Sequence, residues 1–144
     1  MKQAERSAEI PLPADEVFAF LSNLENLPRW QSGVLRAELT SPGPIGVGSK
    51  AVVERRFFGQ RIAADLEVTV YEPPRRIVLK TETSGVSVQA SVEIEPVEPR
   101  RCRVTFGMAM ETSGFFMQAV EPMVAQAAEA DIEASLTRLR EVLA

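Results

Sequence analysis

The sequence predicts an α+β fold in which a curved antiparallel sheet of seven strands wraps around one long C-terminal helix. Residues 113–144 are rich in helix-forming side chains. The apolar side chains in this stretch recur at spacings of three and four, which places them on one helix face: Ala125, Ala128, Ile132, Leu136, Leu139 and Leu143. Upstream, short segments of alternating polar and apolar residues are punctuated by turns. This second pattern is typical of antiparallel strands.

The elements are predicted in the order β-α-α-β6-α. Residues 3–10 alternate as a strand. Pro13 and the acidic Asp15 then open a helix, because proline and negative charge both suit a first helical turn. A second short helix falls within residues 23–29, and the Gly- and Pro-rich residues 41–48 form a loop. The six later strands are expected at residues 34–40, 50–58, 61–71, 77–83, 86–95 and 101–112.

Length and charge limit the possible functions. A chain of 144 residues can bury a sizeable core, and we expect residues 1–144 to form one domain. The net charge of -4 and the pI of about 5.0 argue against nucleic acid or an anionic membrane surface as the main partner. No apolar run approaches the roughly 18 residues of a membrane span. The first ten residues lack an apolar signal core, which predicts a cytoplasmic protein.

The chain contains no histidine. This excludes Ser-His-Asp and Cys-His nucleophilic catalysis and removes both His-ligated zinc and the commonest general base. Cys102 is alone, so it makes no intrachain disulfide, and its alternation with Val104 predicts a buried thiol. We expect no metal and no cofactor. An enzyme would have to use carboxylates, Lys, Arg or Tyr71, and Tyr71 is expected to face outward.

Four motifs at the joints between elements resemble the START-related superfamily of helix-grip proteins (SRPBCC). They are IPLPADEVF at residues 10–18, NLPRW at 26–30, GVG at 46–48 and VYEPPRRI at 70–77. The resemblance spans nearly the whole chain and is greatest to the bacterial polyketide cyclase/dehydrase and lipid transport group. It implies a helix-grip fold with an apolar cavity between the sheet and the long helix. It does not name a ligand, because one fold carries many functions.

Strand alternation and the helix pattern predict which side chains line this cavity. With Gly59 and Gln60 as a two-residue turn, Arg55 would lie opposite Ala64 on the inner face. The predicted ligand-binding residues of the strands are Arg55, Phe57, Ala64, Leu66, Leu79, Thr81, Val88, Ala90, Phe106, Met108 and Met110. Those of the long helix are Phe116, Val120, Met123, Val124 and Ala127, and the last candidate is Trp30. Each of these side chains is alternatively a core residue without ligand contact.

For two of these residues, Arg55 and Trp30, the alternative roles can be stated more specifically. Arg55 on an inner face is costly unless it is paired, so it either binds an acidic or phenolic ligand group, pairs with Asp131, or faces solvent in a shifted register. Trp30 either gates the cavity and stacks on an aromatic ligand or is a structural plug. Pro122 is expected to kink the long helix and make an adjustable entrance there.

The leading hypothesis is a binding module for a hydrophobic small molecule, either a lipid or a polyketide-like compound. The alternative is a polyketide aromatase/cyclase or dehydratase in the same cavity. Its candidate groups are Arg55 with a nearby carboxylate, or Thr81 and Thr83 with ordered water. A third possibility is a homodimer formed through a sheet edge or a helix face.

Overall fold

The computed structural model describes residues 2–57, 59–83, 86–112 and 115–143. The sheet has the order β1-β7-β6-β5-β4-β3-β2 and is antiparallel throughout. This confirms the predicted fold class. In chain order the elements are β1 (Lys2–Ile10), α1 (Ala14–Ser22), the 3-10 turn η1 (Leu24–Asn26), α2 (Leu27–Trp30), β2 (Val34–Leu39), β3 (Lys50–Phe57), β4 (Gln60–Glu72), β5 (Arg76–Thr83), β6 (Val86–Glu98), β7 (Arg101–Thr112) and α3 (Phe115–Leu143).

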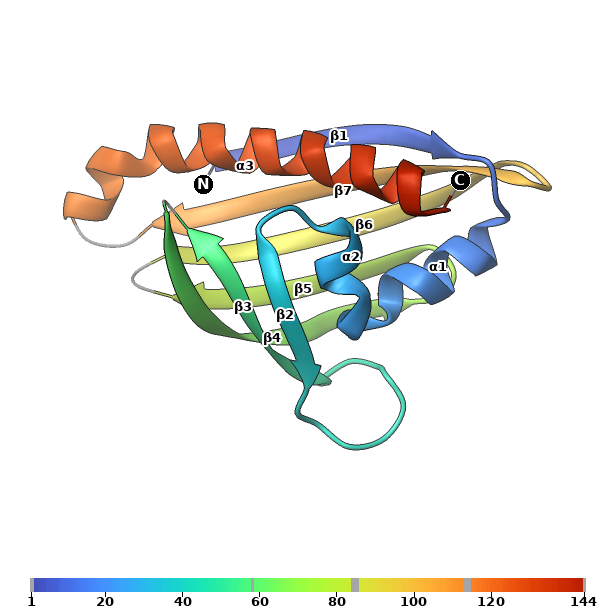
Figure 1. Cartoon of the computed structure of the whole chain (residues 1–144), viewed down its shortest axis with the longest axis horizontal. Helices are drawn as coiled ribbons and strands as arrows, with labels where there is room; N and C mark the ends of the chain where they lie inside the picture. The colour runs from blue at the N-terminus through green and yellow to red at the C-terminus, as the bar shows by residue number, and fades with distance from the viewer. Residues whose placement is uncertain (1, 58, 84–85, 113–114, 144) are drawn as a thin grey trace.

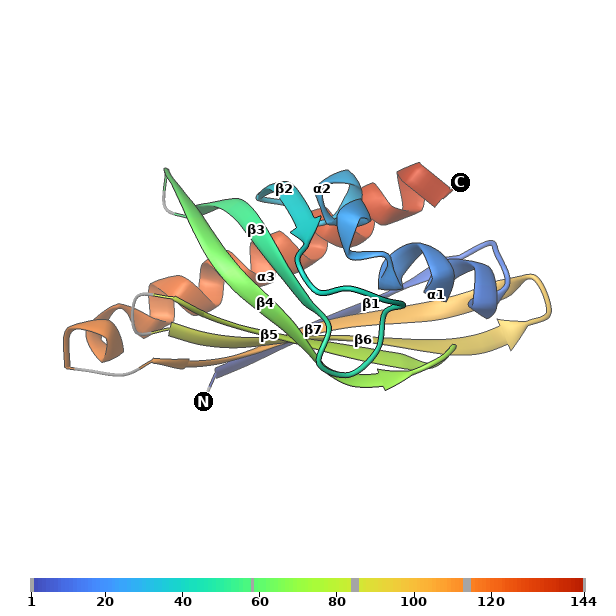
Figure 2. The ribbon, with the colours of Figure 1, turned by 90° about the horizontal axis from the view of Figure 1, so that it is seen from below.

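The sheet curves so that its two halves face different directions. In Figure 1, α3 runs along β1 and β7, and in Figure 2 the strands β2 and β3 rise out of the plane of β5, β6 and β7. The helices α1 and α2 lie on the same side of the sheet as α3 (Figure 2). The helix α3 packs on β1, β7 and α2. The space enclosed by the concave sheet face, α2 and the middle of α3 is where a site can form.

The C-terminal half of α3 anchors the helix to the sheet. Ala128, Ile132, Leu136 and Leu139 are buried, as their spacing predicted. The N-terminal half is different, because Pro122 and Met123 are exposed. The helix continues through Pro122 as one element, so the predicted entrance at this proline stays a prediction.

The β3–β4 hairpin corrects one predicted register. Phe57 pairs with Gln60 and Arg55 pairs with Ile62, so Ala64 lies opposite Val53 and not opposite Arg55. The change moves each partner by two residues. Because side chains alternate with a period of two, a two-residue shift leaves every side chain on its predicted face.

Two bulges correct further details. A register shift in β4 between Val68 and Val70 turns Tyr71 inward, and its ring packs against Phe18 with centroids 5.6 Å apart, so the expected outward position is wrong. In β6, the strand continues to Glu98 with a register shift after Pro96, where a loop was predicted. A proline is tolerated there because bulges interrupt the hydrogen-bond ladder.

Candidate functional site

A cavity of about 180 Å³ lies between the concave sheet face, α2 and α3. Thirteen of the described residues that line it are apolar, namely Leu27, Val34, Val53, Ile62, Ala64, Leu66, Leu79, Val88, Ala90, Met108, Met110, Ala127 and Ala128. The polar ones are Gln31, Arg55, Arg56, Lys80, Thr81 and Asp131. Apolar walls with a few polar groups are typical of small-molecule sites.

Ten of the predicted ligand-binding residues line this cavity, and they come from five strands and α3. They are Arg55, Ala64, Leu66, Leu79, Thr81, Val88, Ala90, Met108, Met110 and Ala127. The side chains of Phe57, Phe116, Val120 and Val124 lie outside the described residues. The structure therefore brings together most of the predicted strand positions.

Three predicted residues lie elsewhere. Trp30 is only 2% exposed and packs edge-on against Phe106, with ring centroids 5.3 Å apart and an interplanar angle of 66°. Both rings belong to the core and neither lines the cavity. Trp30 is therefore a structural core residue, and its position does not suit a gate that stacks on a ligand. Met123 is 59% exposed and is not part of the cavity wall. Met123 lies about one helical turn before Ala127 in α3.

Sequence reasoning missed the contribution of α2 and of the residues after it. Leu27, Gln31 and Val34 all line the cavity. Leu27 and Gln31 are four residues apart, which places them on one side of a helical turn. That spacing was the only available signal, and it is weak in a helix of four residues. Arg56 and Lys80 were also missed, because strand alternation assigns them to the outer face.

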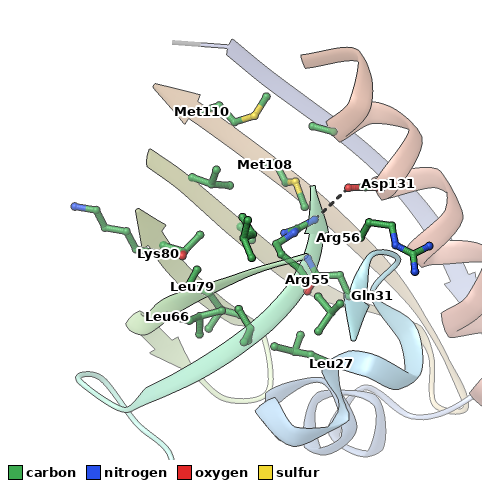
Figure 3. Close-up of a pocket in the computed structure, with 18 of the residues that line it drawn as sticks. Leu27, Gln31, Arg55, Arg56, Leu66, Leu79, Lys80, Met108, Met110 and Asp131 are labelled. Atoms are coloured by element: carbon green, nitrogen blue, oxygen red, sulfur yellow. Dashed lines mark hydrogen bonds and ion pairs between the residues drawn. The ribbon is translucent and has the colours of Figure 1, made fainter. Parts of the chain in front are cut away.

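The polar end of the cavity is built around an ion pair between β3 and α3. Arg55 Nη2 lies 3.2 Å from Asp131 Oδ2, and the two side chains are 19% and 33% exposed. Of the three alternatives left open for Arg55, the structure shows the pairing with Asp131, and Arg55 also borders the cavity. Figure 3 shows the Arg55 guanidinium pointing toward Asp131, with Met108 and Met110 on the neighbouring wall. The contact is single, and Arg55 Nε is buried without a hydrogen-bond partner among the described residues.

Gln31 adds an amide to the same polar end. The side chain is 7% exposed and borders the cavity. Only its backbone hydrogen-bonds to described residues: its N–H donates to Leu27 O at 2.8 Å, and its C=O accepts from Val34 N at 3.3 Å. The following residue is tied to α3, because Ser32 N donates to Ser135 Oγ at 2.8 Å. The backbone beside Gln31 is thus fixed while its amide stays available.

Gly33, just before β2, lies close to the Arg55 guanidinium. Gly33 has a φ of +87°, and a Cβ there would lie 3.5 Å from Arg55 Nη2. Its carbonyl accepts a hydrogen bond from Arg56 N at 2.7 Å. The backbone at Gly33 therefore turns in a conformation that favours glycine and holds β2 close to Arg55.

Two opposing effects act on Asp131. Burial raises the pKa of the Asp131 carboxyl above its ordinary value, and the Arg55 guanidinium opposes the rise. Replacing Arg55 by alanine removes the opposing charge and is therefore expected to raise the pKa of Asp131 further. Carboxyl ¹³C NMR titration of the two proteins measures this, and an unchanged or lower pKa in Arg55→Ala would contradict the pairing.

The same shift gives a pH dependence of stability. The folded state binds the Asp131 proton more tightly than the unfolded state. The resulting contribution to the free energy of unfolding is therefore fully present below the ordinary pKa of an aspartate. It is lost as the pH rises through the raised pKa of the folded state. The wild type should therefore lose stability relative to Asp131→Asn across that window. Urea unfolding at a series of pH values tests this, and a difference that stays constant would contradict it.

A family model described as "Polyketide cyclase / dehydrase and lipid transport" matches residues 1–144. The chain belongs to this family. Among curated proteins, an uncharacterised protein of Mycobacterium tuberculosis is 30% identical over 75% of this chain and 65% of its own length. The chain thus matches about two thirds of that relative. A second uncharacterised M. tuberculosis protein is 26% identical over 99% of both chains.

Solved structures with a similar fold superpose on nearly all of the chain. A START superfamily protein from Mycobacterium smegmatis has a TM-score of 0.81 at 16% identity, covering 98% of this chain and 96% of that one. The di-domain ARO/CYC BexL of the BE-7585A biosynthetic pathway has a TM-score of 0.69 at 19% identity, covering 93% of this chain and 45% of that one. At these identities the likeness shows the START-like helix-grip fold, as the sequence motifs predicted.

Cys102 is not among the residues that line the cavity. Cys102 is buried, as predicted, and burial raises the pKa of its thiol. Within the described ranges, no three His, Cys, Asp or Glu side chains are grouped so as to hold a metal ion. Within the same ranges, none of the helices is both long and apolar enough to cross a membrane.

Proposed function

We propose that this family member binds a small hydrophobic molecule in the cavity between the sheet and α3. The observation that carries the proposal is the cavity itself, whose described wall has thirteen apolar residues and the Arg55–Asp131 ion pair. An apolar cavity of about 150 Å³ holds a benzene-sized molecule. The 180 Å³ found here therefore suits a ligand of one ring or a short branched chain. Met108 and Met110 add a wall that adapts to the shape of a ligand.

Filling the cavity is expected to abolish binding. Ala64 is buried and faces the cavity, whereas its neighbour Ala63 is exposed on the opposite face of β4. Ala64→Leu adds three carbon atoms to the cavity wall, so we expect toluene to bind at least about tenfold more weakly, as for a ligand displaced from its pocket. Methyl NMR titration of Met108 and Met110 measures the affinity.

Ala63→Leu is the matched control, because it adds the same atoms to the outer face of the same strand. Toluene should bind this variant as it binds the wild type. Equal affinity of both variants would show that toluene binds elsewhere and would contradict the proposal.

A second candidate function is catalysis by the same polar cluster, as in a polyketide aromatase/cyclase or dehydratase. The observation that favours it is the Arg55–Asp131 pair, since burial raises the pKa of Asp131 towards the range useful for a general base. Asp131 would take an α-proton and Arg55 would stabilise the developing enolate oxygen. Turnover of a poly-β-ketone that is unaffected by Arg55→Ala would remove this candidate. Cytoplasmic residence and a homodimer stay predictions from the sequence.

A further inference from the structure

The charge of Arg55 beside the cavity is compensated by Asp131. The two form an ion pair at 3.2 Å, and Lys80, on the other side of the pocket in Figure 3, has its Nζ 3.4 Å from Glu82 Oε1. Arg56, the remaining charged residue in the described wall, has an exposed side chain. A ligand carboxylate that reached Arg55 would therefore lie within a few ångströms of the Asp131 carboxylate as well. Like charges in a poorly solvated cavity repel strongly.

The hydrogen-bonding groups at this end are not saturated. Gln31 is 7% exposed and its residue borders the cavity, and Arg55 Nε is buried without a hydrogen-bond partner among the described residues. Arg55 and the Gln31 NH₂ can donate, whereas Asp131 and the Gln31 carbonyl can accept. Buried polar groups without partners cost free energy, so a ligand that supplies both a donor and an acceptor stabilises this end.

We propose that Asp131 makes the cavity selective for neutral ligands: it takes a one-ring molecule with a group that both donates and accepts hydrogen bonds, such as a primary amide or a phenol, and rejects the carboxylate of the same ring. The inference rests on the proposed function, because it requires the cavity to bind a ligand. It adds the charge and the hydrogen-bonding class of that ligand and gives Asp131 a role in specificity.

Three probes of similar shape separate the contributions. Toluene reports on the apolar walls alone, benzamide adds a neutral donor and acceptor, and benzoate is ionised near pH 7. Methyl NMR titration follows Met108 and Met110 in the wall, and the exposed Met123 serves as an internal control. We expect wild-type protein to bind benzamide about tenfold more tightly than benzoate, the effect of one unfavourable charge contact. Benzamide should also bind more tightly than toluene.

Asp131→Asn should reverse the preference. The variant leaves Arg55 without its carboxylate partner, so benzoate is expected to bind at least as tightly as benzamide. Glu129→Gln is the matched control, since it removes the same charge from an exposed position on the same helix. This control should keep the wild-type preference. Gln31→Leu should weaken benzamide binding about tenfold and leave toluene binding intact.

The outcomes distinguish this inference from the proposed function. Wild-type protein that binds benzoate as tightly as benzamide overturns the charge selectivity, and this comparison decides the matter even if Asp131→Asn does not fold. Toluene binding without any gain for benzamide overturns the role of the polar end but leaves the proposed function in place. Failure of toluene and benzamide alike to shift Met108 and Met110 overturns both. If Glu129→Gln reverses the preference in the same way as Asp131→Asn, the change in preference comes from the net charge of the protein. That outcome also overturns the role of Asp131.

Discussion

Replacing Trp30 by alanine is expected to lower the free energy of unfolding by about 3–5 kcal/mol. The indole is 2% exposed and meets the Phe106 ring edge-on, so the change leaves a large hole at the junction of α2 and β7. The aromatic contact is lost as well as the buried area. Urea unfolding followed by circular dichroism measures the change.

Trp30→Phe is the informative control for this prediction. It keeps an aromatic ring beside Phe106 and should cost clearly less than the alanine variant. The Trp30 Nε1 atom is buried with no partner among the described residues, so its removal breaks none of the hydrogen bonds found there. A loss below about 1 kcal/mol in Trp30→Ala would show a peripheral side chain and would restore the gate hypothesis.

Replacing Leu139 by alanine is expected to cost about 2–5 kcal/mol, because this side chain is fully buried in the anchoring half of α3. Val142 lies three residues further on the same helix and is 37% exposed. Val142→Ala should therefore change stability by no more than about 0.5 kcal/mol. Thermal unfolding of both variants makes the comparison. Equal losses would mean that the C-terminal half of α3 does not anchor the helix as described.

Much of the fold could be predicted because strand side chains alternate between two faces. The face of a side chain therefore does not depend on the exact pairing of the strands. The turn after Phe57 was placed one residue too far along, which moves each cross-strand partner by two residues, and Arg55 was therefore given the wrong partner. Its side chain still points inward, because strand faces alternate with a period of two. The same robustness applies to Ala64, Leu79 and Met108, all of which line the cavity.

Two errors occur where a bulge interrupts the alternation of side chains along a strand. The bulge between Val68 and Val70 reverses the direction of Tyr71, and nothing in the local sequence marks the extra residue. Pro96 predicted a loop because proline interrupts most strands, but an irregular register after it accommodates the ring. Bulges are set by the curvature of the whole sheet, so a single strand's sequence does not reveal them.

The polar end of the cavity needed tertiary structure. Arg55 and Asp131 are 76 residues apart, and their pairing was one of three alternatives that the sequence left open. Gln31 was not foreseen, because it follows a helix of four residues whose orientation depends on α3. Trp30, the neighbouring residue, was chosen for its chemistry, yet it turns to the core. Residue type identified the right segment, and packing decided which side chain of that segment meets the cavity.

The cavity between the sheet and α3 is proposed here as a ligand site. A crystal structure of the protein soaked with bromobenzene tests it most directly, since the bromine is located by anomalous scattering. We predict one strong peak inside the cavity, in contact with Ala64, Ala90 and Met108. A cavity closed by rearranged side chains, with bromine only on the outer surface, would contradict the claim.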